Sequence, residues 1–427
     1  MRVARRAVLA SIAAAVAGPA VLRRAFADTP PVTLKLHHHF SAVSGSHDKF
    51  LAPWARKVEA ESNGRIRLDL FPSMQLGGAP AQLFDQARDG VADIVWAAPS
   101  GTPGRFAKAE TFELPFVLSR RALVNSRAIE DFAAAYLQDE FREVHPICFA
   151  CRDHGVVHTT RAVKSIEDLK GLRLHVPNRL AGEAVQALGG RGVSVPTPQL
   201  PMALAGHVID GCLDPWDVVP GLRLNNTLKN HADFAESGLS TAVFVLAMNK
   251  AAYERLPREL KTVIDNNAGQ VAAGMAGAMW DIEARAAEDA ARDRGEAITV
   301  LTPQEVAPWR HATEPVIVAW QKQMKDRKVD GGKLLAAVRV LLAKYADEPE
   351  PQPPTAPSPE ASQPAERKVV GEPRRSPQAN AEVSIRPRAD APAAAPPATP
   401  APPTAAAPVA QPAPAAVPRP KELDIPL

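Results

Sequence analysis

The stretch SIEDLKGLRLHVPNR, residues 165–179, contains the kinds of element from which the whole fold is assembled. Ser165 occupies a helix N-cap position and Gly171 a helix stop, which predicts about one helical turn between them. An alternation of apolar and polar residues follows and ends at a proline, which predicts a short strand. A helix from about Arg179 to Leu188 comes directly after this strand.

The two faces of this strand carry side chains of different character. Leu172, Leu174 and Val176 lie on one side and are predicted to face a core. Arg173 and His175 share the opposite side. The strand therefore brings a histidine to its end, where a helix is about to start, and the reason depends on what the protein does.

Strands and helices alternate through the rest of the chain. Such an order implies parallel sheet covered by helices on both faces. The last helix is marked at its start by Thr302, Pro303 and Glu305, which fit an N-cap, a first-turn proline and a capping-box glutamate. The other predicted strands cover 32–40, 64–71, 91–98, about 193–196 and 209–215. The other predicted helices cover 48–62, 80–88, 200–207 and 258–294, and the last helix covers 303–325.

The composition changes sharply near Ala346. Of the 42 prolines in the chain, 22 lie from Pro349 onward, mixed with alanine and scattered charges. Such a segment lacks the branched and aromatic side chains that offset the loss of chain entropy, so residues 346–427 are predicted to form a disordered tail. The folded part then covers about 31–345, a length that favours two lobes.

The N-terminus has the pattern of a secretory signal peptide. Arg2, Arg5 and Arg6 precede an alanine-rich apolar run, and an A-x-A site ends at Ala27. The run from Ala7 to Leu22 is short for a membrane span. We expect residues 1–27 to be removed and the protein to be exported to the periplasm, with the choice between the Sec and twin-arginine routes left open.

Charge and cysteine content argue against several classes of protein. A formal net charge of +3 gives no sign of the basic patch that is typical of a nucleic-acid partner. Three cysteines cannot form a disulfide framework. Cys148 and Cys151 are spaced as C-x-x-C, but their neighbours favour a strand, where positions three apart point to opposite faces. We expect no redox or metal role for this pair.

No catalytic or cofactor motif of weight is present in the sequence. It lacks G-x-G-x-x-G, G-x-x-x-x-G-K-[ST], H-E-x-x-H and G-x-S-x-G. The run His37 to His39 suggests a metal site, but on a strand His38 faces away from the other two and no nearby acidic or thiol group completes the site. We favour histidines near the rim of a cleft, and we expect no enzyme activity, no metal and no cofactor.

An exported two-lobe α/β protein without catalytic motifs fits a receptor that binds a small molecule between its lobes. Five segments together resemble the periplasmic solute receptors of TRAP transporters, the DctP-type family. Their order and spacing match from about Val32 to Lys344, and the Pro/Ala-rich tail falls outside the resemblance. The segments are PWARKVEAESNGRIRLDLFPSMQLGG (53–78), DQARDGVADIVW (85–96), FELPF (112–116), SIEDLKGLRLHVPN (165–178) and LAGHVIDGCLDPW (204–216).

The resemblance implies two α/β lobes with mixed sheets, joined by crossing strands and by a long helix that packs on both. Residues 28–152 with a return segment 241–280 are expected to form the first lobe, and 153–240 with 281–345 the second. The implied partner is a two-part integral membrane permease driven by an ion gradient. The segments 99–116 and 214–221 are most similar to a branch whose solutes include aromatic and hydroxy-carboxylic acids.

In this family an arginine usually occupies the position of His175 and grips the solute carboxylate. A guanidinium gives two parallel hydrogen bonds and stays charged, whereas an imidazole is mostly neutral at neutral pH and offers no fork. Three explanations remain open. Arg179 supplies the guanidinium from the next helix; Arg105 or Arg152 supplies it from a neighbouring segment; or the solute is neutral, or its binding depends on pH.

Other side chains are candidates for ligand contact. Trp216 and Trp96 would stack on a flat solute, with core packing as the competing interpretation. Asp214 stands where the family commonly has asparagine, and its carboxylate would repel an anionic solute unless it is paired or meets a hydroxyl or cationic group. The remaining candidates are His47, His154, His158 and Phe116.

We interpret the chain as an exported TRAP-type receptor that captures a small organic acid, aromatic or hydroxylated, and passes it to the permease. One alternative is a periplasmic subunit that reports a ligand to a membrane kinase. A second is a two-lobe enzyme. The tail would span the periplasm, tether the receptor or bind a partner, and the sequence does not choose among these.

Overall fold

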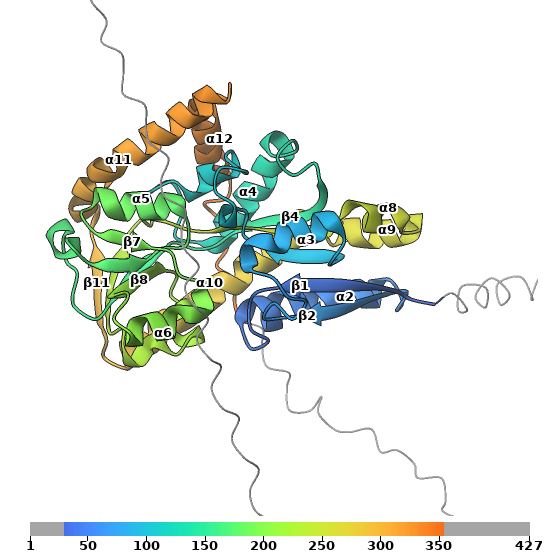
Figure 1. Ribbon diagram of the computed structural model, residues 1–427, viewed down its shortest axis with the longest axis horizontal. Coiled ribbons are helices and arrows are strands. Elements are labelled where there is room, and N and C mark those ends of the chain that lie inside the picture. The colour runs from blue at the N-terminus through green and yellow to red at the C-terminus, as the bar shows by residue number, and fades with distance from the viewer. Residues whose placement is uncertain (1–29, 354–427) are drawn as a thin grey trace, which may run out of the picture. The chain divides into compact units, whose positions relative to one another are not determined.

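The computed structural model describes residues 30–353, which form two mixed β-sheets with helices packed on them (Figure 1). The first sheet has the strand order β2-β1-β3-β10-β4. β1 is parallel to β2 and β3, as the alternation of strands and helices predicts, whereas β10 is antiparallel to β3 and β4. The strands are β1 (Val32–His38), β2 (Ile66–Phe71), β3 (Ile94–Ala97), β4 (Val144–Cys151) and β10 (Val243–Asn249).

The second sheet has the order β11-β9-β5-β8-β6-β7. Its strand β6 comes from the stretch quoted first and is parallel to both β7 and β8. β7 lies slightly before the predicted 193–196, because Arg191 to Val193 is the part that pairs with β6. The strands are β5 (Val156–Thr159), β6 (Arg173–His175), β7 (Arg191–Val193), β8 (Gly211–Asp214), β9 (Asn230–Phe234) and β11 (Ala297–Leu301).

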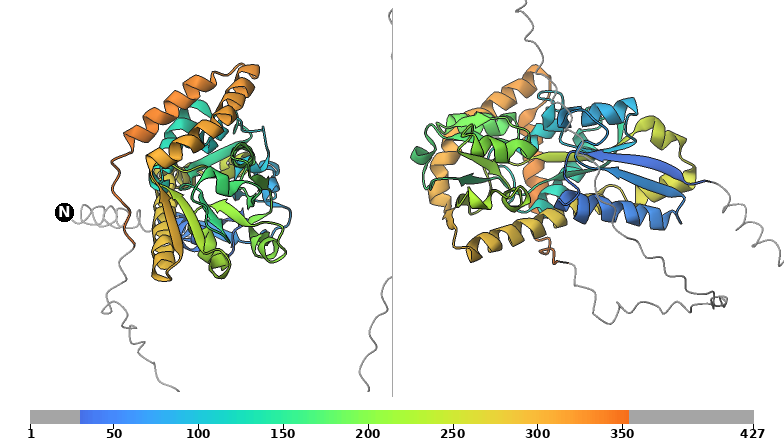
Figure 2. Two further views of the ribbon diagram at one scale, coloured as in Figure 1. Left: turned by 90° about the vertical axis from the view of Figure 1, so that its left-hand side faces the viewer. Right: turned by 60° about the horizontal axis from the view of Figure 1, so that its bottom comes forward.

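Two connections between strands and one long helix join the sheets. The chain passes from β4 to β5 through residues 152–155 and returns from β9 to β10 through 235–242. Helix α10 (Gln270–Asp293) begins beside the first sheet, where Trp280 is buried in its core, and ends beside the second, where Ala291 packs with β5 (Figures 1 and 2). This is the two-lobe arrangement that the resemblance implied.

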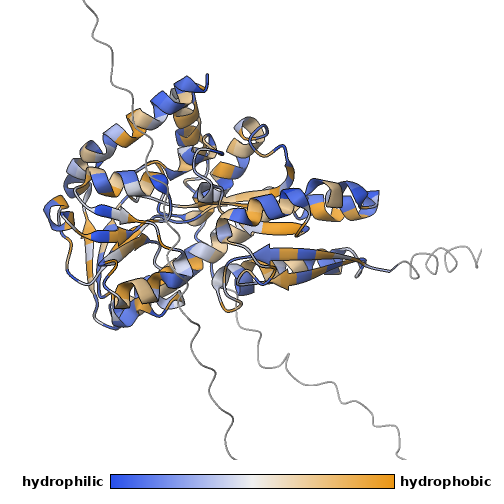
Figure 3. Ribbon diagram, viewed as in Figure 1, coloured by the Kyte–Doolittle hydropathy of each residue, from blue (hydrophilic) through white to orange (hydrophobic). Residues whose placement is uncertain are grey.

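The first sheet separates two hydrophobic cores, one on each face. Cys148 lies in the core beside α2 and α10, and Cys151 lies in the core beside α3 and α4. The C-x-x-C residues therefore point to opposite faces, as predicted. Figure 3 shows hydrophobic residues concentrated along the strands, while the outer helices carry residues of both kinds. These helices are α2 (Ala52–Glu61), α3 (Leu83–Asp89), α4 (Ala122–Tyr136), α5 (Arg179–Ala187), α6 (Leu200–Ala205), α7 (Val218–Gly221), α8 (Lys250–Arg255), α9 (Arg258–Asn266), α11 (Pro303–Asp326) and α12 (Gly331–Lys344).

Local signals at the helix ends act as the sequence predicts. Thr302 and Glu305 form a reciprocal capping box at the start of α11. The turn after Ser165 is a short 3-10 helix, Ile166–Leu169, and Gly171 follows with a φ of +74°. The predicted helix over 258–294 is instead two helices, because Gly269 between α9 and α10 has a φ of +57° and interrupts the helical backbone.

The segment after α12 is held against the folded unit, which corrects the predicted start of the tail at 346. Arg121 donates from Nη1 to the carbonyl oxygen of Glu348 at 2.6 Å, and Arg285 donates from Nη1 to Glu350 Oε2 at 3.0 Å. Residues 354–427 of the predicted tail and the predicted signal peptide, 1–27, lie outside the described residues. Within 30–353 no helix is both long and apolar enough to cross a membrane.

Candidate ligand-binding site

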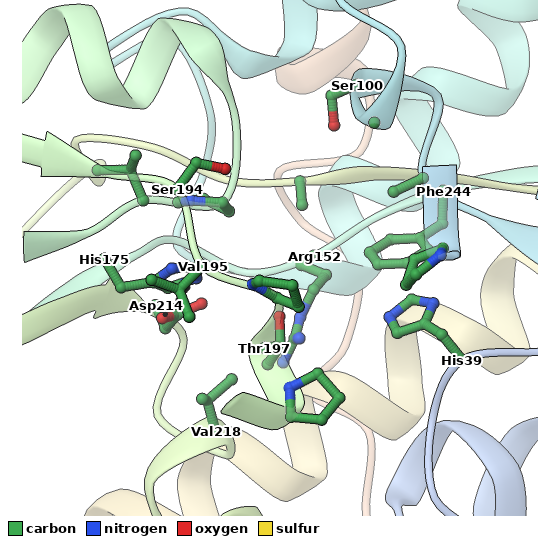
Figure 4. A pocket seen from close by; sticks show the side chains of 18 of the residues that line it. His39, Ser100, Arg152, His175, Ser194, Val195, Thr197, Asp214, Val218 and Phe244 are labelled. Atoms are coloured by element: carbon green, nitrogen blue, oxygen red, sulfur yellow. Dashed lines mark ion pairs between the residues drawn. The ribbon is translucent and has the colours of Figure 1, made fainter. Parts of the chain in front are cut away.

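A cavity of about 340 Å³ lies between the two sheets (Figure 4). Its lining comes from loops and strand ends of both lobes, including the carboxyl ends of β1, β3, β6, β7 and β8. Crevices at the carboxyl ends of parallel strands are the usual ligand sites of open α/β sheets. The first lobe contributes His39, Ser100, Arg152 and Phe244, and the second contributes His175, Ser194, Thr197 and Asp214.

The end of β6 delivers His175 to this cavity, which answers the question raised by the sequence. Pro177 stops the strand, and the side chain of Asn178 accepts a hydrogen bond from the backbone N–H of Ala181 at 2.9 Å, which caps α5. Asn178 Nδ2 also donates to the carbonyl oxygen of Thr241 at 2.7 Å. The turn after His175 is thus tied to the segment that returns to the first sheet.

Several buried polar atoms at the cavity have no hydrogen-bond partner among the described residues. They are both ring nitrogens of His175, Nδ1 of His39, Oδ2 of Asp214, Oγ of Ser240 and Nε of Arg152. An unsatisfied buried polar group is costly and uncommon in native proteins. All five residues line one cavity, so these side chains are the candidates for polar contact with a ligand.

Among the described residues that line the cavity, Arg152 is the only arginine or lysine. Its side chain is 8% exposed, lies over the ring of Trp280 with Cζ 5.5 Å from the centroid, and donates from Nη2 to Oδ1 of Asp217. Its backbone is fixed as well, because its carbonyl oxygen accepts from Asn125 Nδ2 at 2.9 Å. A buried guanidinium in a fixed position, with donors not used by the protein, suits a planar carboxylate.

Asp214 does not oppose an anionic ligand in the way that its sequence position suggested. Burial raises the pKa of its carboxyl, and this effect outweighs the charges of His175 and Arg152, which act to lower it. A raised pKa favours the neutral acid. The repulsion expected from an ionised Asp214 is correspondingly reduced.

Aromatic and aliphatic side chains form the other walls of the cavity. Phe40 and Phe244 lie with ring centroids 5.7 Å apart, and the ring of His39 is stacked on Phe244 with an angle of 18° between the planes. Val176, Val195 and Val218 add apolar surface from the second lobe. A flat ring with one acidic group matches this combination of surfaces.

The structure places Arg179 and Arg105 outside the cavity lining. Arg179 donates to Glu110 at 2.7 Å and to Glu183 at 2.6 Å, so its guanidinium is occupied by two carboxylates. Arg105 is held in the same way by Asp85 at 2.7 Å and by Glu143 at 2.9 Å. Of the arginines considered as replacements for the family arginine, only Arg152 reaches the cavity.

Both candidate tryptophans are core residues behind the cavity. Trp96 stacks on Phe244 with ring centroids 5.2 Å apart and therefore supports a lining residue without lining the cavity itself. Trp216 donates from Nε1 to Asp233 Oδ2 at 3.2 Å and packs against His158. Packing, the competing interpretation for both tryptophans, agrees with these positions.

The remaining candidates are also occupied by contacts within the protein and do not line the cavity. His47 Nδ1 lies 2.9 Å from His38 Nε2, and His154 Nε2 lies 2.5 Å from Asp233 Oδ1. His158 contacts the carbonyl oxygen of Asp214 at 3.1 Å and so supports a lining residue from behind. Phe116 packs on Phe234 in the second lobe.

Sequence reasoning did not find the hydroxyl groups of the cavity or Phe244. Ser194, Thr197, Ser240 and Thr241 lie in loops whose positions depend on the order of strands in the sheets, which no local pattern specifies. His39, which belongs to the histidine run expected near the rim of a cleft, does line the cavity. Within residues 30–353 no group of three or more His, Cys, Asp or Glu side chains is arranged to hold a metal ion.

Residues 37–323 match the family described as bacterial extracellular solute-binding protein, family 7, DctP. The chain belongs to this family. A TRAP solute-binding protein from Rhodoferax ferrireducens T118, solved with copurified benzoate, is 38% identical, with a TM-score of 0.71 over 74% of this chain and 98% of that chain. A marine metagenome TRAP solute-binding protein in complex with 3-hydroxybenzoate is also 38% identical, with a TM-score of 0.72 over 74% and 99%. A third, from Bordetella bronchiseptica with bound mandelate, is 26% identical, with a TM-score of 0.69 over 74% and 100%.

The protein is thus a TRAP-type solute receptor, as its sequence indicated, and its function is binding and not catalysis. The family is extracytoplasmic, and receptors of this type capture small organic acids and work with a membrane permease.

Proposed function

We propose that this DctP-family receptor captures an aromatic monocarboxylate in the cavity between its lobes, with Arg152 as the carboxylate anchor. The observation that carries the proposal is the position of Arg152. It is the single arginine or lysine in the lining, it is buried, and its Nε has no hydrogen-bond partner among the described residues. A charge-assisted hydrogen bond from the guanidinium to a ligand carboxylate would use a donor that the protein leaves unpaired.

The apolar walls support a ring as the rest of the ligand. Phe40, Phe244 and the valines of the second lobe offer faces on which an aromatic ring packs. The two relatives at 38% identity were solved with benzoate and with 3-hydroxybenzoate, which are aromatic monocarboxylates. A volume of about 340 Å³ lies within the range typical of small-molecule sites.

We infer that residues 1–27 direct export of the receptor and are cleaved after Ala27. The exported receptor then delivers the acid to a two-part membrane permease. Mass spectrometry of the secreted protein tests the cleavage site, and an N-terminus other than Asp28 would contradict it.

The experiment that tests the ligand class compares acids with their neutral isosteres. Isothermal titration calorimetry of the exported chain with benzoate and benzamide should give a dissociation constant at least tenfold lower for benzoate, because the amide cannot form a charge-assisted pair with Arg152. Cyclohexanecarboxylate, which retains the charge and lacks the flat ring, should bind more weakly than benzoate. Equal binding of benzoate and benzamide would overturn the proposal.

A further inference from the structure

His175 and Asp214 form a pair of polar side chains in the second-lobe wall of the cavity (Figure 4). Nε2 of His175 lies 3.6 Å from Oδ2 of Asp214, which is too far for a hydrogen bond. Both side chains are buried, with residue exposures of 3% and 5%. Neither atom has another hydrogen-bond partner among residues 30–353.

The backbone holds this pair in register. β6 and β8 are parallel neighbours, with His175 opposite Cys212, so that His175 and Asp214 come to the same edge of the sheet. On the side of β8 away from β6, β5 holds Asp214, because Asp214 pairs with Val156 and its carbonyl oxygen lies 3.1 Å from Nε2 of His158. The 3.6 Å distance between His175 Nε2 and Asp214 Oδ2 is therefore set by strands that are each paired with a neighbour on both sides.

The unsatisfied atoms Nε2 of His175 and Oδ2 of Asp214 limit the chemical groups of a ligand that can bind to both of them. A hydroxyl group donates one hydrogen bond and accepts others, so a single hydroxyl oxygen can satisfy both a histidine nitrogen and a carboxyl oxygen. This holds whether the imidazole nitrogen or the carboxyl group supplies the proton. A carboxylate accepts only and would meet an acceptor at Asp214 whenever that group is ionised.

We infer that His175 and Asp214 read a hydroxyl substituent on the ring of the bound acid, so that the receptor prefers a hydroxylated aromatic monocarboxylate. This inference rests on the proposed function, because Arg152 must hold the carboxylate for the ring to face the pair. It assigns a specificity role to the position where the family arginine has been replaced. The raised pKa of Asp214, caused by burial, is consistent with a wall that carries little negative charge toward an anionic ligand.

A cationic substituent is a poorer match for this wall. Arg152 lies close enough to Asp214 to act on its ionisation, so an ammonium group between His175 and Asp214 would be repelled by the guanidinium. A methoxy group can accept a hydrogen bond and cannot donate one, so it would satisfy one atom of the pair at most. Hydroxyl is the substituent that uses both atoms.

Calorimetry with matched ligands tests the inference on the full exported chain. The probes are benzoate, the three hydroxybenzoate isomers and their methoxy counterparts. At least one hydroxybenzoate should bind about tenfold to a hundredfold more tightly than benzoate, because the added hydrogen bonds relieve two buried unsatisfied groups. The methoxy counterpart of that isomer should lose most of this gain.

Variants assign the preference to the pair. His175→Phe should reduce the ratio of affinities for hydroxybenzoate and benzoate to about one, and Asp214→Asn, which keeps a donor and an acceptor, should retain part of it. The matched control is His311→Gln, because His311 also lies beside a carboxylate, 3.7 Å from Glu314, but is 89% exposed in its side chain and does not line the cavity. Circular dichroism and thermal unfolding confirm that each variant is folded.

The outcomes separate the two proposals. A hydroxyl preference that His175→Phe removes and His311→Gln keeps supports the inference. Equal binding of benzoate and every hydroxybenzoate by the wild-type protein overturns it and leaves the aromatic-acid function intact, and this comparison needs no variant. Failure of the wild-type protein to bind any of these acids overturns the proposed function together with the inference that rests on it.

Discussion

Nη2 of Arg152 donates a hydrogen bond to Oδ1 of Asp217, which precedes the short helix α7 of the second lobe. Arg152 itself follows β4 of the first lobe, so this ion pair bridges the two lobes at the cavity. The bridge fixes the guanidinium plane and uses one of its nitrogens, while Nε remains without a partner among the described residues. A ligand carboxylate at Arg152 would therefore bind at the junction of the lobes, both of which line the cavity.

The first prediction concerns Arg152 and the affinity for benzoate. Arg152→Gln should weaken binding by about tenfold to a hundredfold or more, because it removes a charge-assisted hydrogen bond from a buried site. Arg152→Lys should give an intermediate loss, since an ammonium keeps the charge but not the fork. Calorimetry measures both values.

Arg179→Gln is the control for this experiment. Arg179 is a nearby arginine of the second lobe, but Glu110 and Glu183 occupy its guanidinium outside the cavity. Its substitution should change the benzoate affinity by less than about twofold. A larger effect for Arg179→Gln than for Arg152→Gln would show that the anchor has been placed on the wrong residue.

A second prediction concerns Asp233, a fully buried carboxylate of β9. Burial alone would raise its pKa, but the charge and hydrogen bond of His154, together with Arg120 and Trp216, lower it to about 2. The folded state therefore favours the ionised form, and this stabilisation is present above the unfolded-state pKa of about 3.9 and is lost as the pH falls toward 2. Asp233→Asn should reduce the free energy of unfolding at pH 7 by on the order of 2 kcal/mol.

Urea unfolding at two pH values checks this assignment. The difference between wild type and Asp233→Asn should shrink by about half between pH 7 and pH 3, because the unfolded state of the wild type takes up a proton first. Asp210→Asn serves as the comparison, since Asp210 pairs with Arg173 at 2.7 Å in a partly exposed position and should matter less at pH 7. A pH-independent difference for Asp233→Asn would contradict the proposed origin of its effect.

A third prediction uses Glu113, which is 2% exposed. Burial raises its pKa to about 8, in spite of the hydrogen bond that it accepts from the backbone N–H of Val243 at 3.1 Å. The folded state then binds a proton that the unfolded state releases near pH 4.5. The wild type should therefore lose stability relative to Glu113→Gln by on the order of 1 kcal/mol per pH unit between pH 4.5 and 8.

The sign of this effect distinguishes Glu113 from an ordinary surface carboxylate. Denaturant titrations of both proteins at pH 6 and pH 8 give the difference in the free energy of unfolding between the wild type and Glu113→Gln at each pH. The stability of Glu113→Gln relative to the wild type should increase as the pH rises from 6 to 8. If its relative stability is instead greater at pH 6, Glu113 is ionised in the folded protein.

Local signals in the sequence were sufficient for most elements of the fold. The capping box of Thr302 and Glu305, the alternation in β6 and the opposite faces of Cys148 and Cys151 follow from rules that span a few residues, and all three are present in the structure. The break between α9 and α10 was missed because apolar periodicity continues across it, and only the positive φ of Gly269 marks it.

The site was harder to predict because it is assembled from distant segments. His175 and Asp214 were each predicted as ligand contacts from one position in a family motif, and both line the cavity. Arg152 could not be separated from Arg105 and Arg179, because the sequence does not show which carboxylates already occupy a guanidinium. Ion pairs such as that of Arg179 with Glu110, 69 residues apart in the chain, decide the question and are visible only after folding.

The last prediction concerns the segment that follows α12. Arg121 donates to the carbonyl oxygens of Glu348 and Pro349 at 2.6 and 3.0 Å, and Arg285 donates to Glu350 at 3.0 Å. A chain that ends at Tyr345 loses these contacts, whereas one that ends at Pro353 keeps them. The shorter protein should be less stable by about 1 to 2 kcal/mol, since a few partly exposed hydrogen bonds are removed.

A double-mutant cycle attributes this difference to the contacts and not to chain length. Arg121→Ala should lower the free energy of unfolding in the chain that ends at Pro353 and have a smaller effect in the chain that ends at Tyr345, where the acceptor carbonyls are gone. Equal effects of Arg121→Ala in both chains would mean that Arg121 acts through other neighbours. In that case a difference in stability between the two chains would be attributed to other contacts of the segment 346–353, such as that of Arg285 with Glu350, and not to Arg121.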